Sequence, residues 1–231
     1  MALHKKLLEK LRVRRPDEFD DDGEHYASAQ ELIRQGRPVE ALSEFKKALQ
    51  ASERVPETHL ALGHLYEQLE RPDDAIQAFT QAIKANPELA EAYTAAGLAY
   101  DRAGEFLKAV RMHLKAMRLS PQNFDLRMNL GNAYFNVGSY PEATRAYEQA
   151  LEIEPENTAA HYALALVYLD LENKVAAREQ WEAIKRLGDS AAAEKLADEI
   201  DRQSLRSSRM SADGDEPFPD TVKEEPTPLF S

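Results

Sequence analysis

Apolar residues recur along this chain at helical spacing, in short paired runs that a turn separates. The clearest pair occupies residues 124–157, where one run ends near Gly138 and the next opens at Pro141. Apolar positions three and four residues apart are typical of an amphipathic helix. Glycine supplies the geometry of a tight turn, and proline is tolerated in the first turn of a helix. This stretch therefore predicts two helices joined by a short turn.

The same helix pair repeats with a period of 34 residues and no gaps, as the spacing from Pro121 to Pro155 shows. Small residues at fixed places let two backbones approach, and large residues fill the space beside them. The register holds for glycine, tyrosine, alanine and proline alike: Gly63, Gly97 and Gly131; Tyr66, Tyr100 and Tyr134; Ala41, Ala75, Ala109 and Ala143; Pro87, Pro121 and Pro155. A period this regular predicts a repeat array.

These markers resemble the tetratricopeptide repeat, a helix–turn–helix with Leu-Gly, Tyr, Ala, Phe, Ala and Pro at fixed places. The resemblance covers five contiguous units: 22–55, 56–89, 90–123, 124–157 and 158–191. It implies an all-α fold, a right-handed superhelical solenoid of five helix–turn–helix units. The outer units depart from the pattern, with Ala29 and Glu53 in place of Gly and Pro in the first, and Ala165 and Trp181 at marker places in the fifth.

The segments that flank the array have characters of their own. A stripe of apolar residues predicts a helix at 192–206, which would cap the last unit. Residues 207–231 are acidic and contain four prolines after residue 216, so we expect a disordered tail, with Phe218 and Leu229-Phe230 as a possible recognition motif. Residues 1–21 combine a basic amphipathic helix with an acidic linker. The helix within 2–14 could cap the first unit, dock on a partner or this protein's own groove, or lie on an anionic membrane.

Composition narrows the functional classes. The chain has 231 residues, a net charge of −12 and no cysteine. The acidic balance argues against general nucleic-acid binding, and the absence of cysteine excludes disulfides and thiolate metal sites. No apolar run follows the basic N-terminus, and no stretch is long enough to span a bilayer, so we expect a cytoplasmic protein.

The resemblance also implies a binding surface. In the family, the first helices of the units line a concave groove, and the ligand contacts recur at the second, fifth, sixth, ninth, twelfth and thirteenth places. Transferring this rule predicts the following peptide-binding residues: Tyr26, Gln30, Ile33, Arg34, Leu60, His64, Glu67, Thr94, Leu98, Asp101, Arg102, Asp125, Met128, Asn129, Asn132, Phe135, Asn136, Tyr162, Leu166 and Leu169.

The residue types at these places indicate the chemistry of the ligand. A well-known branch of the family grips a C-terminal carboxylate with Lys, Asn and Arg. Here the equivalent basic places hold Tyr26, Leu60, Glu91 and Ala95, so that clamp is absent. Acidic residues outnumber Arg34 and Arg102 in the groove. By charge complementarity, we expect a basic or amphipathic segment of a partner protein.

Asn129, Asn132 and Asn136 form the sharpest local feature. Their spacing of three and four places them on one helical face, although Asn is a poor helix former. Their amides could bind a peptide backbone whatever its sequence, or they could simply face water.

No catalytic or cofactor motif accompanies these features. The six histidines form no HExxH-type pair, and His113, which replaces the large aromatic residue of its unit, is expected to be a packed core residue. We therefore expect neither an enzyme nor a bound cofactor or metal. The sequence favours a protein–protein interaction adaptor. A chaperone or assembly factor of a secretion or pilus-type system and a membrane-recruited scaffold are the alternatives.

Overall fold

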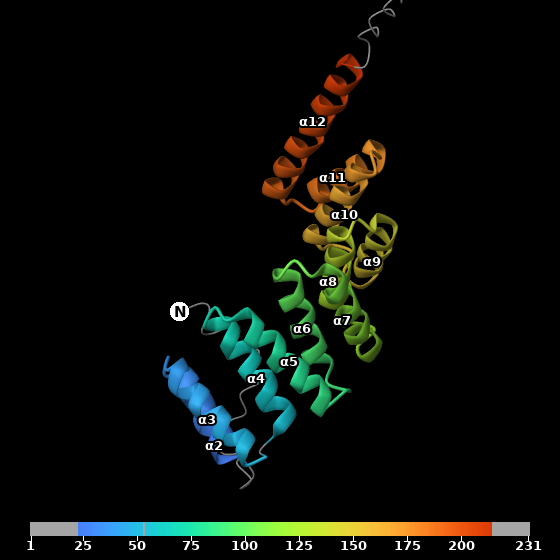
Figure 1. The fold of residues 1–231 in the computed structure, drawn as a ribbon. Helices are drawn as coiled ribbons and strands as arrows, with labels where there is room; N and C mark the ends of the chain where they lie inside the picture. Colours follow the sequence, from blue (N-terminus) through green and yellow to red (C-terminus); the bar gives the residue numbers. More distant parts are fainter. Residues whose placement is uncertain (1–22, 53, 214–231) are drawn as a thin grey trace, which may run out of the picture.

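The computed structural model describes residues 23–52 and 54–213, which form an elongated array of helices (Figure 1). Within these residues there is no strand. The helices are α2 (Glu24–Arg34), α3 (Pro38–Gln50), α4 (Val55–Gln68), α5 (Pro72–Ala85), α6 (Ala90–Arg102), α7 (Phe106–Leu119), α8 (Phe124–Asn136), α9 (Tyr140–Ile153), α10 (Thr158–Asp170), α11 (Lys174–Arg186) and α12 (Ser190–Asp213).

The helices pack in sequence order. The two helices of each unit pack on one another, from α2 with α3 to α10 with α11. Each second helix also packs on the first helix of the next unit, as α5 does on α6 and α7 on α8. Repeats that contact mainly their neighbours define a solenoid, so the all-α solenoid expected from the sequence is confirmed.

The turn inside each unit depends on one residue with left-handed backbone geometry. Gly36, Gly104 and Gly138 hold φ values of 75°, 73° and 75° at this place. Glu70 and Glu172 occupy the same place in the second and fifth units, both with φ of 57°. A side chain in this region is strained, so these two turns cost more to form than the three glycine turns.

In the core of each of the three central units, a glycine packs against the ring of the residue that follows it by sixteen positions in the chain. A Cβ atom at Gly63 would lie 2.2 Å from Phe79, and one at Gly131 would lie 2.5 Å from Tyr147. At Gly97 the ring is that of His113, which is fully buried, as expected for a core histidine. The repeated glycine is therefore required by the close approach of a ring.

Helix α12 covers the end of the array. Leu196 and Ile200 are buried against α10 and α11, and the indole N–H of Trp181 donates to the carbonyl oxygen of Ala193 at 2.9 Å. The helix runs from Ser190 to Asp213 and so is longer at both ends than the 192–206 expected. Residues 207–213, which we expected to belong to the disordered tail, are helical. Residues 1–21 and 214–231 lie outside the described residues.

The start of α12 offers a pH-dependent prediction. Asp189 accepts from the amide of Ala192 at 3.0 Å and from the hydroxyl of Thr158 at 2.9 Å, and these bonds hold the pKa of Asp189 below its ordinary value of 3.8. Because the pKa is lower in the folded state, the carboxylate stabilises the fold above pH 3.8, and the stabilisation is lost as the pH falls through the folded pKa. Asp189→Ala should therefore melt at a lower temperature than the unmodified protein at pH 7.

Thermal unfolding followed by circular dichroism from pH 7 down to pH 3 checks this expectation. The gap between the two melting temperatures should narrow below pH 3.8, because the carboxylate of the unmodified protein then begins to be protonated. Asp189→Asn serves as the control, since its amide oxygen still accepts hydrogen bonds but does not titrate. A gap that stays constant across the whole pH range would contradict the assignment.

Candidate peptide-binding groove

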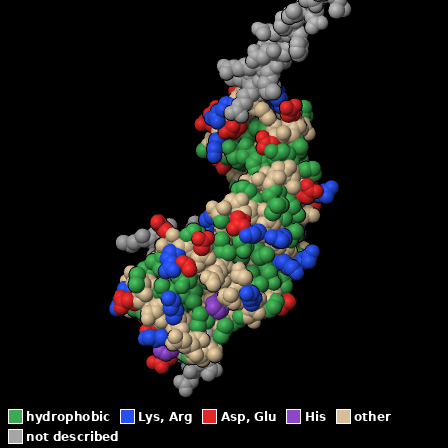
Figure 2. All heavy atoms as spheres, in the orientation of Figure 1, with side chains coloured by type: hydrophobic (Ala, Val, Ile, Leu, Met, Phe, Trp, Pro, Cys, Tyr) green, Lys and Arg blue, Asp and Glu red, His purple; other side chains and the backbone are tan. Residues whose placement is uncertain are grey.

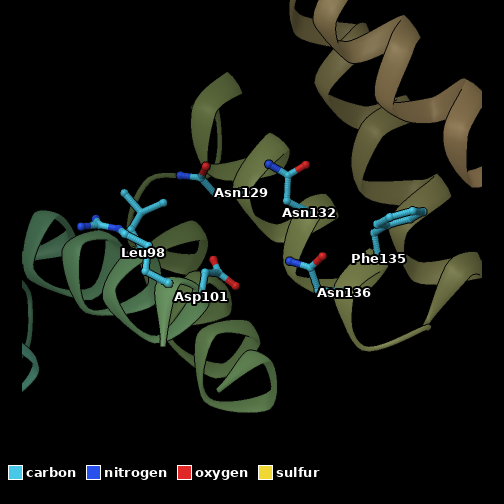
Figure 3. A pocket seen from close by; sticks show the side chains of 7 residues that line it. Leu98, Asp101, Asn129, Asn132, Phe135 and Asn136 are labelled. Atoms are coloured by element: carbon cyan, nitrogen blue, oxygen red, sulfur yellow. The ribbon is translucent and has the colours of Figure 1, made fainter. Parts of the chain in front are cut away.

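Two neighbouring first helices, α6 and α8, enclose a pocket of about 330 Å³. Every side chain that lines it belongs to the set predicted from the sequence: Leu98, Asp101, Arg102, Asn129, Asn132, Phe135 and Asn136. Figure 3 shows Asp101 on one helix facing the asparagines on the other across this space. The pocket is part amide, part charged and part apolar, which suits a peptide rather than a purely apolar ligand.

The asparagines reach the pocket because of how α8 is built. The side chain of Asn123 accepts from the amide of Leu126 at 3.0 Å and so caps the helix. Leu126, Leu130 and Ala133 are buried on one face. The three asparagines lie on an adjacent face of the helix, and Asn132 and Asn136 are exposed there.

Asn132 is oriented from behind by the core. The hydroxyl of Tyr147 donates to its Oδ1 atom at 2.6 Å. Burial raises the pKa of Tyr147 above its ordinary value, so the phenol stays protonated and keeps its donor role at neutral pH. Because the carbonyl oxygen of Asn132 is occupied in this way, its amide N–H groups are the part left to face a ligand.

Asp101 is held in a similar way. Nε2 of the buried His113 lies 2.9 Å from its Oδ2 atom, and since a carboxylate only accepts, the imidazole donates this bond. The second carboxylate oxygen, Oδ1, is buried and has no hydrogen-bond partner among the described residues. Asp101 therefore places a fixed negative charge in the wall of the pocket.

Arg102, the basic residue of the pocket, is already paired. Its Nη1 atom lies 2.7 Å from Oε1 of Glu67 on α4. Nδ1 of the buried His64 lies 3.4 Å from the other oxygen of Glu67. This group links the second and third units through their first helices and offsets the positive charge of Arg102. Asp101 and the amides thus set the polarity of the pocket.

The structure places the other predicted residues away from this pocket. Several are buried between helices, which corrects the expectation that they line an open groove: Gln30, Ile33, Leu60, His64 and Leu169. Others are half-buried in the packing: Tyr26, Met128, Tyr162 and Leu166. Tyr26 packs edge-on against Phe45 at 5.5 Å, and burial raises its pKa to about 12.

Three of the remaining predicted residues have other surroundings. Arg34 pairs with Glu31 at 2.7 Å, and the hydroxyl of Thr94 donates to a carbonyl of its own helix at 3.0 Å. Asp125 is exposed at the start of α8.

Sequence reasoning missed the two residues that orient the pocket from behind. Tyr147 and His113 were read as core markers, which is correct, but their polar ends also fix Asn132 and Asp101. The sequence did contain a signal for this: a ring with a polar atom stands at the core position, and a polar groove residue precedes it by twelve places (Asp101 before His113) or fifteen (Asn132 before Tyr147).

Two further features are absent from the part of the chain that the structure describes. No group of His, Cys, Asp or Glu is arranged to hold a metal ion. No helix there is both long enough and apolar enough to cross a membrane.

The sequence matches three models described as tetratricopeptide repeat, at residues 32–99, 124–157 and 146–195. The chain is also similar to solved structures of MamA. One is 26% identical, covers 71% of this chain and 96% of that chain, and has a TM-score of 0.66. A second is 27% identical and covers 75% and 92%, with a TM-score of 0.64.

A third, MamA residues 41 to the end from Desulfovibrio magneticus RS-1, shares the fold at 20% identity. It covers 72% of this chain and 94% of that chain, with a TM-score of 0.67. No curated protein gives a significant sequence match.

Proposed function

Because this chain belongs to the tetratricopeptide repeat family, a family of protein–protein interaction scaffolds, we propose that it is an adaptor whose groove binds a segment of a partner protein. The binding centre is the pocket between α6 and α8. The ligand is a basic or amphipathic segment, extended or helical. The proposal assigns a binding role and no catalytic one.

One observation carries the proposal: seven side chains predicted as ligand contacts converge on a single pocket. Tyr147 holds Asn132 so that its amide N–H groups are left to donate, and His113 holds Asp101 as a fixed negative charge in the wall of the pocket. The amide of Asn132 can donate to a carbonyl oxygen of a peptide backbone, and the negative charge of Asp101 favours a basic side chain beside it. Fixed polar groups of this kind favour binding because little side-chain entropy is lost.

The charge of the first helices supports a basic ligand. Acidic side chains are exposed along four of them: Glu57, Glu91, Asp125 and Asp170. The predicted basic contacts, Arg34 and Arg102, are each paired with a glutamate at 2.7 Å. The field over this surface is therefore negative, which speeds the encounter with basic segments and disfavours acidic ones.

Placing arginine at both Asn129 and Asn136 should abolish capture of the partner. The change removes two amides and puts two positive charges where a basic ligand would lie. At about 0.5–1.5 kcal/mol for each lost hydrogen bond, before any repulsion, binding should weaken tenfold or more. Asn132 is left intact because its bond to Tyr147 contributes to the core.

The measurement is affinity purification read by quantitative mass spectrometry. The matched control is Gln50→Arg with Gln77→Arg, which adds the same charge at exposed positions on two second helices. Proteins retained by the control and lost from the groove variant are the ligands. Equal recovery with both variants, at unchanged circular dichroism, would rule out this pocket as the binding site.

A further inference from the structure

Helix α7 exposes a basic stripe on the second-helix layer of the array. We define the α7 stripe as Leu107, Arg111, Lys115 and Arg118, all exposed. Their spacing of four, four and three residues places them along one face of the helix, opposite the buried Ala109, Val110, His113 and Ala116. Leu107 is an apolar side chain that is 72% exposed.

The cations of this stripe have no internal partners. Arg111, Lys115 and Arg118 form no ion pair with any described residue. Lys108 on the same helix, in contrast, pairs with Glu105. Like charges three or four residues apart destabilise a helix. A row of three such charges in an acidic protein is therefore available to an outside anion.

The stripe is narrow. The second helices on either side, α5 and α9, carry exposed acids such as Asp73, Glu142 and Glu148. Figure 2 shows Lys and Arg side chains gathered beside α7, with acidic side chains scattered over the rest of this face. A broad anionic surface, such as a membrane or a nucleic acid, would meet these acids as well as the stripe. A short acidic chain segment would meet only the stripe.

We propose that the α7 stripe docks the acidic C-terminal segment of this chain, residues 214–231. This segment contains five acidic residues and one basic residue, Lys223. It also contains the apolar residues Phe218, Leu229 and Phe230, which match the exposed Leu107. Charge and apolar character are thus complementary between the segment and the stripe. The proposal is independent of the groove.

The segment follows Asp213 at the far end of α12, so it must run back along the array to reach α7 (Figure 1). Its 18 residues span up to about 60 Å when extended, at about 3.3–3.6 Å per residue. Helix α7 has 14 residues and is about 21 Å long, at about 1.5 Å per residue.

A spin label on the segment tests the proposal in the full-length protein. The chain has no cysteine, so Thr221→Cys provides one attachment site for a nitroxide. We expect the amide signals of Arg111, Lys115 and Arg118 in nuclear magnetic resonance spectra to broaden selectively. Raising the salt from 0.05 to 0.5 M should remove the broadening, because the Debye length then falls to a few ångströms.

Charge reversal gives the matched comparison. Glutamate at positions 111, 115 and 118 should abolish the broadening. Glutamate in place of Lys46, Lys84 and Arg178 changes the net charge equally, at exposed residues outside α7, and should preserve it. Broadening that is absent from α7, or that survives reversal of the stripe, would overturn the proposal. Binding to phosphatidylserine vesicles that depends on the stripe, without broadening of α7, would assign the surface to a membrane instead.

Discussion

Replacing Gly131 with alanine is expected to destabilise the protein, whereas the same substitution in a Tyr147→Ala background is expected to stabilise it. A Cβ atom at position 131 would lie 2.5 Å from Cε1 of Tyr147. That ring is buried and its hydroxyl is bonded to Asn132, so it cannot move aside without breaking the bond. Removing the ring removes the clash.

Two opposing free-energy terms decide whether Gly131→Ala stabilises or destabilises the protein. Overpacking a core costs about 1–3 kcal/mol, and alanine gains about 1 kcal/mol over glycine inside a helix. Gly131→Ala should therefore lower the free energy of unfolding by up to about 2 kcal/mol in the unmodified protein. Tyr147→Ala alone should lower it by about 3–5 kcal/mol, because it empties the space of a large ring. Adding Gly131→Ala to that variant should restore about 1 kcal/mol.

Urea unfolding of the four proteins gives the coupling free energy directly. The control is Gln50→Ala, an exposed helical position with no ring beside it. Equal effects of Gly131→Ala in both backgrounds would mean that the ring does not explain the repeated glycine. The same relation should hold at Gly63 with Phe79 and at Gly97 with His113, since the contacts are equally close.

These contacts also show why the fold could be predicted from the sequence. The 34-residue period reports a contact that every unit repeats, so Gly131 and Tyr147 stand out without any coordinates. The left-handed turn residue also repeats, but it cannot be recognised from the sequence in every unit. Glu70 and Glu172 stand at this place in two units, where the surrounding packing holds them in a geometry that glycine prefers.

The candidate site could be predicted only in part. A positional rule identifies the helix face, which brought Asn129, Asn132 and Asn136 to one pocket. The rule does not predict how deeply each residue on that face is buried. Ile33 and Leu60 occupy places of the same rule, yet both are buried against the neighbouring helices. Burial depends on the size of residues in the adjacent unit, which a rule for single units does not contain.

The end of the array should unfold separately from its middle. Leu196 on α12 is fully buried against α10 and α11. Leu196→Ala should cost about 2–5 kcal/mol, because it leaves a cavity that the surrounding residues fill only partly. In a solenoid each repeat is stabilised mainly by its neighbours, so the loss should fall on the fifth unit and spread little further.

Hydrogen exchange read by mass spectrometry distinguishes local from global unfolding. In Leu196→Ala, amides of α10 and α11 should exchange faster, while those of α4 to α7 should keep their rates. Glu194→Ala, an exposed change on the same helix, is the control. Faster exchange throughout the array would contradict the expectation and would mean that the five units unfold as one body. Local unfolding would instead spare the pocket between α6 and α8, because α6 packs on α5, α7 and α8, and α8 is held by α7 and α9 as well as by α10. The capping helix would then protect the array while contributing little to the groove.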